Sequence, residues 1–304
     1  MICEIAPAKI NLTLEILNKR NDGYHEIKSV MQTIDICDVL TFWENEWIQV
    51  IPEYSNLPPE DTLPDFDNFN YFSNNLVYRA AMVLRELTGY KDGAVIQLKK
   101  NIPSSAGLGG GSSDAAATLK GLNKLWNLKL STKELAEIGS KIGSDIPFFI
   151  YGGTCLATGR GEIIEKIKPL PKKWLGIILL PLKIPEKTKK IYSHITSINY
   201  SSGETTTVLV ENIKNGHNEN KLDHFNGKFE NFIFNVFEMV YKNSFKEYND
   251  WTEKLNNIIN KPFHLSGSGP SIFYISNSEF EIKEIIKEIK EELNLNKYIA
   301  QTVP

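Results

Sequence analysis

The stretch IPSSAGLGGGSSDAAATL, residues 102–119, runs from a cluster of glycines directly into a series of good helix formers. Glycine lets backbone N–H groups approach an anion closely, and the first N–H groups of a helix are unpaired at the positive end of its dipole. Ser112, Ser113 and Asp114 are typical N-cap residues, so they predict a helix that begins at Ala115. A flexible linker or a tight turn between strands is the alternative, but neither needs capping residues followed by alanines. The stretch therefore predicts a phosphate-binding loop.

This loop differs from two widespread phosphate loops. A Walker A loop has a lysine directly after its last glycine, and none follows here. A dinucleotide fingerprint has the spacing Gly-x-Gly-x-x-Gly, which Gly107, Gly109, Gly110 and Gly111 do not follow. Any lysine that contacts the bound phosphate must therefore come from another part of the chain.

The composition is that of an ordinary globular protein. Hydrophobic residues make up 41% of the 304 residues, and the net charge of −3 gives no indication of a nucleic-acid surface. Cys3, Cys37 and Cys155 are too far apart for a disulfide framework or a CxxC metal site, which suits a reducing compartment. The start of the chain has no signal-peptide pattern, and the apolar run 174–182 is too short to span a bilayer. We expect a cytoplasmic protein without a nucleic-acid, membrane or obligate protein partner.

Hydrophobic periodicity predicts an α+β fold. Residues 10–16 alternate apolar and polar side chains as a half-buried strand does, and three further strands are predicted at 28–36, 38–43 and 47–51. Helices are predicted by apolar stripes or capping signals and loops by proline, glycine and polar composition. The expected helices are 76–88, 131–143 and 281–293, and the expected loops are 52–74 and 199–228. The apolar run 174–182 is expected to open a second domain.

Three stretches together resemble the superfamily of galactokinase, homoserine kinase, mevalonate kinase and phosphomevalonate kinase. They are PAKINLTL at 7–14, the glycine-rich stretch, and LSGSGPSIFYI at 265–275. The resemblance implies a left-handed β-α-β N-terminal domain and a ferredoxin-like C-terminal domain with the active site between them. We expect residues 1–166 to form the ATP-binding domain with the catalytic residues, and residues 167–304 to contribute to the substrate site.

Within this superfamily the sequence closely resembles the 4-diphosphocytidyl-2-C-methyl-D-erythritol kinase family. The matching segments are RNDGYH at 20–25, NNLVYRAA at 74–81 and GSDIPFF at 143–149. The resemblance implies ATP- and Mg²⁺-dependent phosphorylation of a 2-hydroxyl in the non-mevalonate isoprenoid precursor pathway. A homoserine or mevalonate kinase, diphosphomevalonate decarboxylase and a non-catalytic nucleotide sensor are the alternatives, and the DGYH segment, Lys9 and Asp145 argue against them.

The resemblance assigns catalysis to Lys9 and Asp145. By itself, Asp145 would be interpreted as a helix N-cap before Pro147, and Lys9 as a solvated lysine at the start of a strand. In the family, the aspartate takes the proton of the substrate hydroxyl and the lysine keeps that aspartate ionised. Lys9 shares a polar strand face with Asn11, which we expect to contact the substrate.

The resemblance also assigns residues to the two ligands. Tyr24 is expected to stack on the cytosine, His25 to bond its edge, and Tyr192 to cover its other face. Asn75 and Lys100 match family positions near the adenine of ATP; without the family they would be interpreted only as a helix cap and an exposed strand end. The hydroxyl of Ser112 or Ser113 is expected to reach Mg²⁺. The full set expected at the nucleotide is Asn75, Lys100, Pro103, Gly107, Leu108, Gly109, Gly110, Gly111, Ser112 and Ser113.

Overall fold

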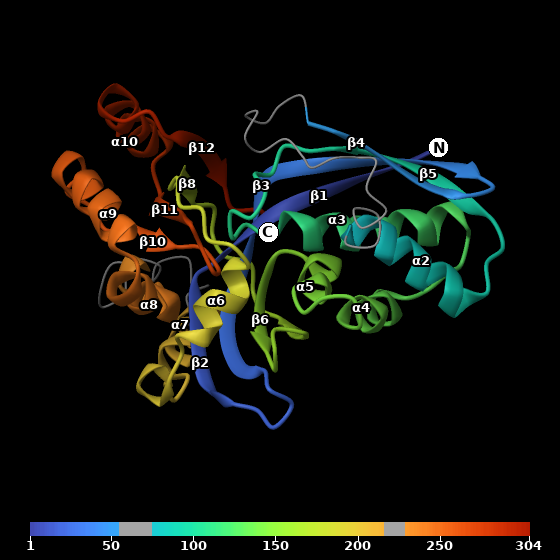
Figure 1. Ribbon diagram of the computed structural model, residues 1–304, viewed down its shortest axis with the longest axis horizontal. Helices are drawn as coiled ribbons and strands as arrows, with labels where there is room; N and C mark the ends of the chain where they lie inside the picture. The colour runs from blue at the N-terminus through green and yellow to red at the C-terminus, as the bar shows by residue number, and fades with distance from the viewer. Residues whose placement is uncertain (55–74, 216–228) are drawn as a thin grey trace.

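The computed structural model describes residues 1–54, 75–215 and 229–304 (Figure 1). A first sheet of eight strands, among the described residues, is built around one long strand, β3, which pairs with four other strands. Its strands are β1 (Ile2–Asn11), β2 (Thr13–Lys19), β3 (His25–Asn45), β4 (Ile48–Glu53), β5 (Gly93–Lys99), β6 (Thr154–Thr158), β7 (Ile163–Lys166) and β9 (Phe234–Asn235). The two strands predicted between residues 28 and 43 are therefore one continuous strand, because β3 changes partners along its length instead of turning.

Four helices cover one face of this sheet, as Figure 1 shows. They are α2 (Leu76–Thr88), α3 (Gly110–Leu125), α4 (Thr132–Ser140) and α5 (Ile146–Tyr151). The prediction for α2 is confirmed: its apolar stripe is buried and the Asn75 side chain caps it. Ser131 forms the predicted capping box with Glu134, although α4 ends at Ser140, before the predicted end at 143.

The prediction that the helix after the glycines begins at Ala115 is wrong. Helix α3 begins at Gly110, and its N-cap is Gly109 with φ of +75°. Glycine adopts this left-handed backbone without steric cost, so the chain can enter the helix inside the glycine run. Ser112 and Ser113 consequently lie in the first turn of α3. The Ser112 N–H belongs to the helix terminus, whereas the Ser113 N–H donates to the Gly109 carbonyl at 2.9 Å.

A second sheet of four antiparallel strands has the order β10-β11-β8-β12 among the described residues. Its strands are β8 (Trp174–Leu179), β10 (His264–Leu265), β11 (Ser271–Ser276) and β12 (Asn296–Gln301). The helices of this half are α6 (Lys187–Ser193), α7 (Glu204–Asn215), α8 (Val236–Ser244), α9 (Lys246–Ile258) and α10 (Glu279–Glu292). Helix α10 packs against β8, and Gly176 leaves room for Ile286 there. It agrees with the helix predicted at 281–293.

The loop predicted at 199–228 is partly wrong, because α7 occupies residues 204–215. Helix α7 buries Leu209, Val210 and Ile213, but its threonines and asparagines have low helix propensity, so the tertiary contacts decide. Residues 216–228, and most of the loop predicted at 52–74, lie outside the described residues.

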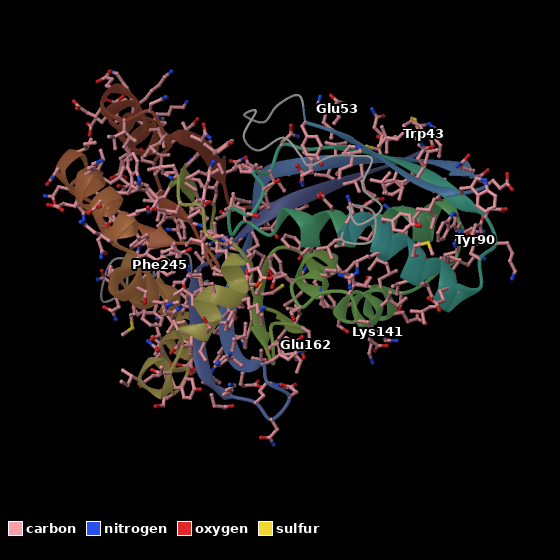
Figure 2. The ribbon with its side chains drawn as sticks, in the orientation of Figure 1. Trp43, Glu53, Tyr90, Lys141, Glu162 and Phe245 are labelled. Atoms are coloured by element: carbon pink, nitrogen blue, oxygen red, sulfur yellow. The ribbon has the colours of Figure 1, made fainter. Side chains whose placement is uncertain are left out.

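The two sheets share one of the hydrophobic cores. Ile10 and Val30 of the first sheet and Ile177 and Phe273 of the second all belong to a single buried cluster. In Figure 2, labelled aromatic residues lie toward opposite ends of the molecule, Tyr90 beside the first sheet and Phe245 among the helices of the second half. The predicted α+β class is confirmed by these two sheets and their helices, whereas the division at 166/167 stays a prediction. No helix among the described residues is long and apolar enough to cross a membrane.

Candidate active site

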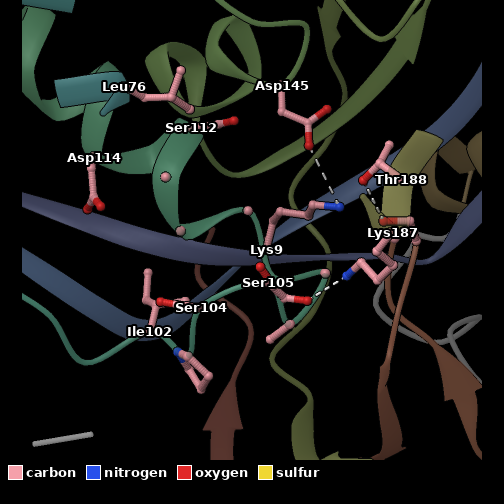
Figure 3. A pocket seen from close by; sticks show the side chains of 18 of the residues that line it. Lys9, Leu76, Ile102, Ser104, Ser105, Ser112, Asp114, Asp145, Lys187 and Thr188 are labelled. Atoms are coloured by element: carbon pink, nitrogen blue, oxygen red, sulfur yellow. Dashed lines mark hydrogen bonds and ion pairs between the residues drawn. The ribbon is translucent and has the colours of Figure 1, made fainter. Parts of the chain in front are cut away.

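A pocket of about 830 Å³ opens where the glycine-rich loop, β1, the start of α5 and helix α6 meet. Its walls come from both halves of the chain, and Figure 3 shows Lys9 and Asp145 on one side with Lys187 and Thr188 of α6 on the other. Most of the predicted site residues line it. They are Lys9, Asn11, Asn75, Lys100, Pro103, Gly107, Gly109, Gly110, Gly111, Ser112, Asp145 and Tyr192.

Lys9 and Asp145 form an ion pair across the pocket. Lys9 Nζ lies 3.9 Å from Asp145 Oδ2, and their side chains are 5% and 35% exposed. Burial lowers the pKa of Lys9, and the charge of Asp145 opposes this effect. Asp145 occupies the N-cap position of α5, as its local sequence indicates, but its side chain makes no capping hydrogen bond. The carboxylate is thus held beside a cation while part of it still faces the pocket.

Asn11 connects Lys9 to the interior of the sheet. Lys9 Nζ donates a hydrogen bond to Asn11 Oδ1, and Asn11 Nδ2 donates to Ser29 Oγ at 2.8 Å. The backbone N–H of Lys9 also donates to the Leu108 carbonyl at 2.9 Å. This network fixes the side chain of Lys9 and ties β1 to the glycine-rich loop.

The glycine-rich loop is packed against the turn between β10 and β11. Gly107 has φ of +83°, and a Cβ atom there would lie 2.3 Å from the Ser266 carbonyl oxygen. On the other side of the contact, a Cβ on Gly267 would lie 2.9 Å from Lys9 Nζ. The two predicted glycine motifs therefore lie side by side because backbone meets backbone, with no space for side chains.

The structure distinguishes between the two serines. Ser112 lines the pocket, whereas Ser113 is buried and its Oγ donates to the Pro7 carbonyl at 2.6 Å. Ser113 and Leu108 are not among the pocket-lining residues, and Leu108 packs in the core between the sheets. Only the Ser112 hydroxyl, of these two, faces the space in front of α3.

Lys100 is not the exposed strand end that its sequence position indicates. It is buried, and its Nζ forms ion pairs with Asp38 and with Asp114, the latter at 2.6 Å. Burial raises the pKa of Asp114 to about 8, opposed by Lys100 and assisted by Asp38. Sequence reasoning had no signal for Asp38, because its partner Lys100 comes from a distant strand.

An aromatic cluster adjoins the pocket: Tyr192 and Phe237 are among its lining residues, whereas His25 is not. The rings of His25 and Tyr192 stack with centroids 5.3 Å apart, and Tyr192 also contacts Phe237. Burial lowers the pKa of His25, with Lys19 adding to the effect. Tyr24 is 55% exposed, does not line the pocket, and packs under the guanidinium of Arg160. The structure brings His25 and Tyr192 together and leaves Tyr24 at the rim.

Lys187 is a pocket residue that the sequence analysis did not identify. Its Nζ donates to the carbonyl oxygens of Ser105 and Gly269. It is one of three lysines in the segment 187–190, and nothing in that local pattern distinguishes Lys187 from Lys189 or Lys190. Only its position in the pocket does so.

Comparison with known proteins agrees with this geometry. The family model of the GHMP kinases N terminal domain matches residues 75–153. A crystal structure of 4-(cytidine 5'-diphospho)-2C-methyl-D-erythritol kinase superimposes over 100% of both chains with a TM-score of 0.75 and 24% identity. Homoserine kinase from Cytophaga hutchinsonii superimposes over 99% of this chain and 94% of its own, with a TM-score of 0.71 and 17% identity. The fold and the site define a GHMP-type kinase.

Sequence relatives define the family more narrowly. The 4-diphosphocytidyl-2-C-methyl-D-erythritol kinase of Bacillus cereus (strain B4264) is 38% identical over 289 residues, covering 94% of this chain and 91% of the relative. The kinase of the same name from Geobacillus thermodenitrificans is 37% identical over 290 residues with the same coverage. The chain belongs to the 4-diphosphocytidyl-2-C-methyl-D-erythritol kinase family, which confirms the resemblance found in its sequence.

Proposed function

We propose that this protein transfers the terminal phosphate of ATP to the 2-hydroxyl of 4-diphosphocytidyl-2-C-methyl-D-erythritol. The observation that supports this most is the Lys9–Asp145 pair, which lies between a phosphate-binding loop and an aromatic pair. The reaction needs a proton acceptor at the place where nucleotide and alcohol meet, and the pair occupies that place.

In the proposed reaction, Asp145 accepts the proton of the 2-hydroxyl while the substrate oxygen bonds to the terminal phosphorus and the bond from phosphorus to ADP breaks. The carboxylate is a weak base, but the proton leaves as the new bond forms. Lys9 lies 3.9 Å from Asp145 and offsets the negative charge of the transferring group. Because Lys9 is buried and bonded to Asn11, little reorganisation is needed during the reaction.

The nucleotide is proposed to lie with its phosphates on the glycine-rich loop and the N-terminus of α3. Helix α3 has no acidic residue in its first turn, so its dipole is not offset there. Asn75 and Lys100 line the same pocket and are proposed to lie near the adenine. Pro103, Gly107, Gly109, Gly110 and Gly111 complete the proposed contact surface.

Mg²⁺ is proposed to accompany ATP and to offset the charge of its phosphates. The described residues contain no group of three His, Cys, Asp or Glu side chains that could hold a metal ion. A Mg²⁺ ion bound mainly by phosphates and water fits such a site, since Mg²⁺ often has few protein ligands. The hydroxyl of Ser112 is the proposed protein contact, because it faces the pocket in front of α3.

The cytidine is proposed to bind at the aromatic cluster. His25 and Tyr192 already stack on each other, so the base can extend this stack, and Tyr24 can cover it from the rim. Asn11, beside Lys9, is proposed to contact the alcohol end of the substrate. We further propose a cytoplasmic location and no obligate protein partner.

The proposed function is tested by ADP release from ATP and Mg²⁺ with diphosphocytidyl-methylerythritol, mevalonate and homoserine compared in parallel. We expect turnover with the cytidyl substrate alone. Asp145→Asn and Lys9→Ala should each lower kcat by about 10²- to 10⁴-fold, the range for general acid–base residues. Turnover of another alcohol would overturn the assigned substrate, and full activity of Asp145→Asn would overturn the assigned base.

A further inference from the structure

Lys187 lies at the junction of three segments that surround the proposed phosphate site. It opens helix α6, and its ammonium donates to the carbonyl of Ser105 in the glycine-rich loop and to that of Gly269 in the β10–β11 turn. Figure 3 shows its side chain reaching from α6 toward the loop, across the pocket from Lys9. The chain thus places a second lysine at the loop that lacks a Walker-type lysine of its own.

Among the described residues, the ammonium of Lys187 has two hydrogen-bond acceptors and no carboxylate at ion-pair distance. An ammonium has three N–H donors, and within residues 1–54, 75–215 and 229–304 two of them are used by carbonyls. Lys189 on the same helix pairs with Glu186, whereas Lys187 forms no ion pair with any described residue. Burial and, to a smaller extent, the positive charge of Lys9 together lower the pKa of Lys187 to about 7. A buried cation in this state is stabilised by a bound anion.

We propose that Lys187 binds the terminal phosphate of the nucleotide, opposite Lys9. The inference rests on one part of the proposed function, namely that a nucleotide binds at the glycine-rich loop. The positive charges of Lys9 and Lys187 repel each other across the pocket. A phosphate group between the two lysines would stabilise the charged form of both. Lys187 belongs to the substrate half of the chain, so this contact also connects α6 to the loop when nucleotide binds.

Nucleotide binding should then be linked to proton uptake. The charged groups that line the pocket with Lys187 are Lys9 from β1, Lys100 after β5, Asp114 on α3, Asp145 at the start of α5, Arg160 after β6, Glu186 directly before α6 and Lys189 on α6. Asp114 has a pKa of about 8 but is paired with Lys100, and it is present in every variant, so Lys187→Met measures its contribution to proton uptake. At pH 8 a lysine of pKa about 7 is roughly one-tenth protonated. A phosphate contact raises that pKa, so affinity for ATP is highest below pH 7 and declines as the pH rises above it.

The test is titration calorimetry at pH 8 in HEPES and in Tris, whose ionisation enthalpies differ, so that protons taken up can be counted. Wild type, Lys187→Met, Lys187→Arg and Lys190→Met are each titrated with Mg²⁺ and either ATP or ADP, without alcohol. Lys190 is a matched control, since it is exposed on the same helix and outside the pocket lining. Circular dichroism melting checks that each variant folds.

We expect wild type and Lys190→Met to take up about one proton with ATP and much less with ADP. Lys187→Met should take up none and bind ATP about 10- to 100-fold more weakly, the usual effect of losing a charged hydrogen bond. Lys187→Arg should restore most of the affinity without proton uptake, because arginine is always charged. If Lys187 had only a structural role, proton uptake would not depend on the terminal phosphate of the nucleotide.

Equal uptake with ATP and ADP, or no uptake by wild type, would overturn the inference. Uptake on titration with CDP alone would also overturn it, because the ligand of Lys187 would then be the diphosphate of the substrate. If Lys187→Met fails to fold, the inference is still tested by comparing proton uptake with ATP and with ADP for wild type and for Lys187→Arg. Turnover of the cytidyl substrate by the same wild-type preparation tests the proposed function separately.

Discussion

Lys9 and Lys100 are both buried lysines of the pocket, but their partners hold them differently. Lys100 contacts two carboxylates, Asp38 and Asp114, at ion-pair distance, which makes it a fixed part of the wall. Lys9 lies 3.9 Å from a single carboxylate that remains 35% exposed. The looser pair leaves the oxygens of Asp145 accessible to a substrate proton, and this difference favours a catalytic role for Lys9 over Lys100.

At the same scale, the two adjacent serines should respond differently to removal of their hydroxyls. We predict that Ser112→Ala raises the Mg²⁺ concentration needed for half-maximal activity about 3- to 10-fold, because it loses a hydroxyl that faces the pocket. Ser113→Ala should instead lower the free energy of unfolding by about 1 kcal/mol, because it breaks the bond to the Pro7 carbonyl. Mg²⁺ titrations and urea unfolding of both variants measure these effects. The reverse pattern would contradict the proposed metal contact.

At the scale of elements, the glycine-rich loop, the β10–β11 turn and the end of β1 form one unit. Gly107 and Gly267 meet through their backbones, and Lys9 is bonded both to the loop and to Asn11. The position of Lys9, the proposed catalytic lysine, therefore depends on the close packing of two glycine loops that come from opposite parts of the chain.

Gly107→Ala tests this packing, and Gly89→Ala is its matched control. Both glycines have positive φ, +83° and +68°, but only Gly107 has backbone atoms where its Cβ would lie. Gly89→Ala should cost about 1–2 kcal/mol of unfolding free energy from the left-handed backbone alone. Gly107→Ala should cost more and should also raise the KM for ATP. Equal stability losses with unchanged KM would show that the contact does not position the loop.

At the scale of the whole molecule, the pocket lies over a core that belongs to both sheets. Phe273 of β11 is fully buried in a cluster that also contains Ile10 of β1. The last residues reinforce the connection, since the Val303 N–H donates to the Thr33 carbonyl at 2.9 Å. The two halves are therefore held at a fixed relative position, as a site built from both requires.

This continuity predicts that the protein unfolds in urea as a single cooperative transition. Phe273→Ala should lower the free energy of unfolding by about 3–5 kcal/mol and shift the whole transition, since its ring fills the shared core. Phe280→Ala is the control: its side chain is 73% exposed, and its effect should stay within about 0.5 kcal/mol. Two separate transitions in wild type, followed by circular dichroism and tryptophan fluorescence, would contradict this prediction.

Much of the fold could be predicted from the sequence, and the exceptions have identifiable causes. Helix α2 and the capping box of α4 depend on local stripes and caps, so their patterns were sufficient. Helix α7 was missed because its stability comes from packing against β2 and β3 instead of from propensity. The predicted start of α3 is wrong because Ser112, Ser113 and Asp114 resemble capping residues. The actual N-cap is Gly109, and its left-handed φ cannot be recognised from a sequence pattern.

The sequence by itself determined the glycine-rich loop, the family, and the pair of residues, Lys9 and Asp145, expected to act together, because these depend on residue types at short, characteristic spacings. Only the tertiary structure decided that Ser112 faces the pocket, that Lys100 is enclosed by two carboxylates, and that Lys187 reaches the loop from α6. The reason is physical. Burial, distance and charge at each of these groups are set by segments far apart in the chain, which meet only when the two sheets pack on their shared core.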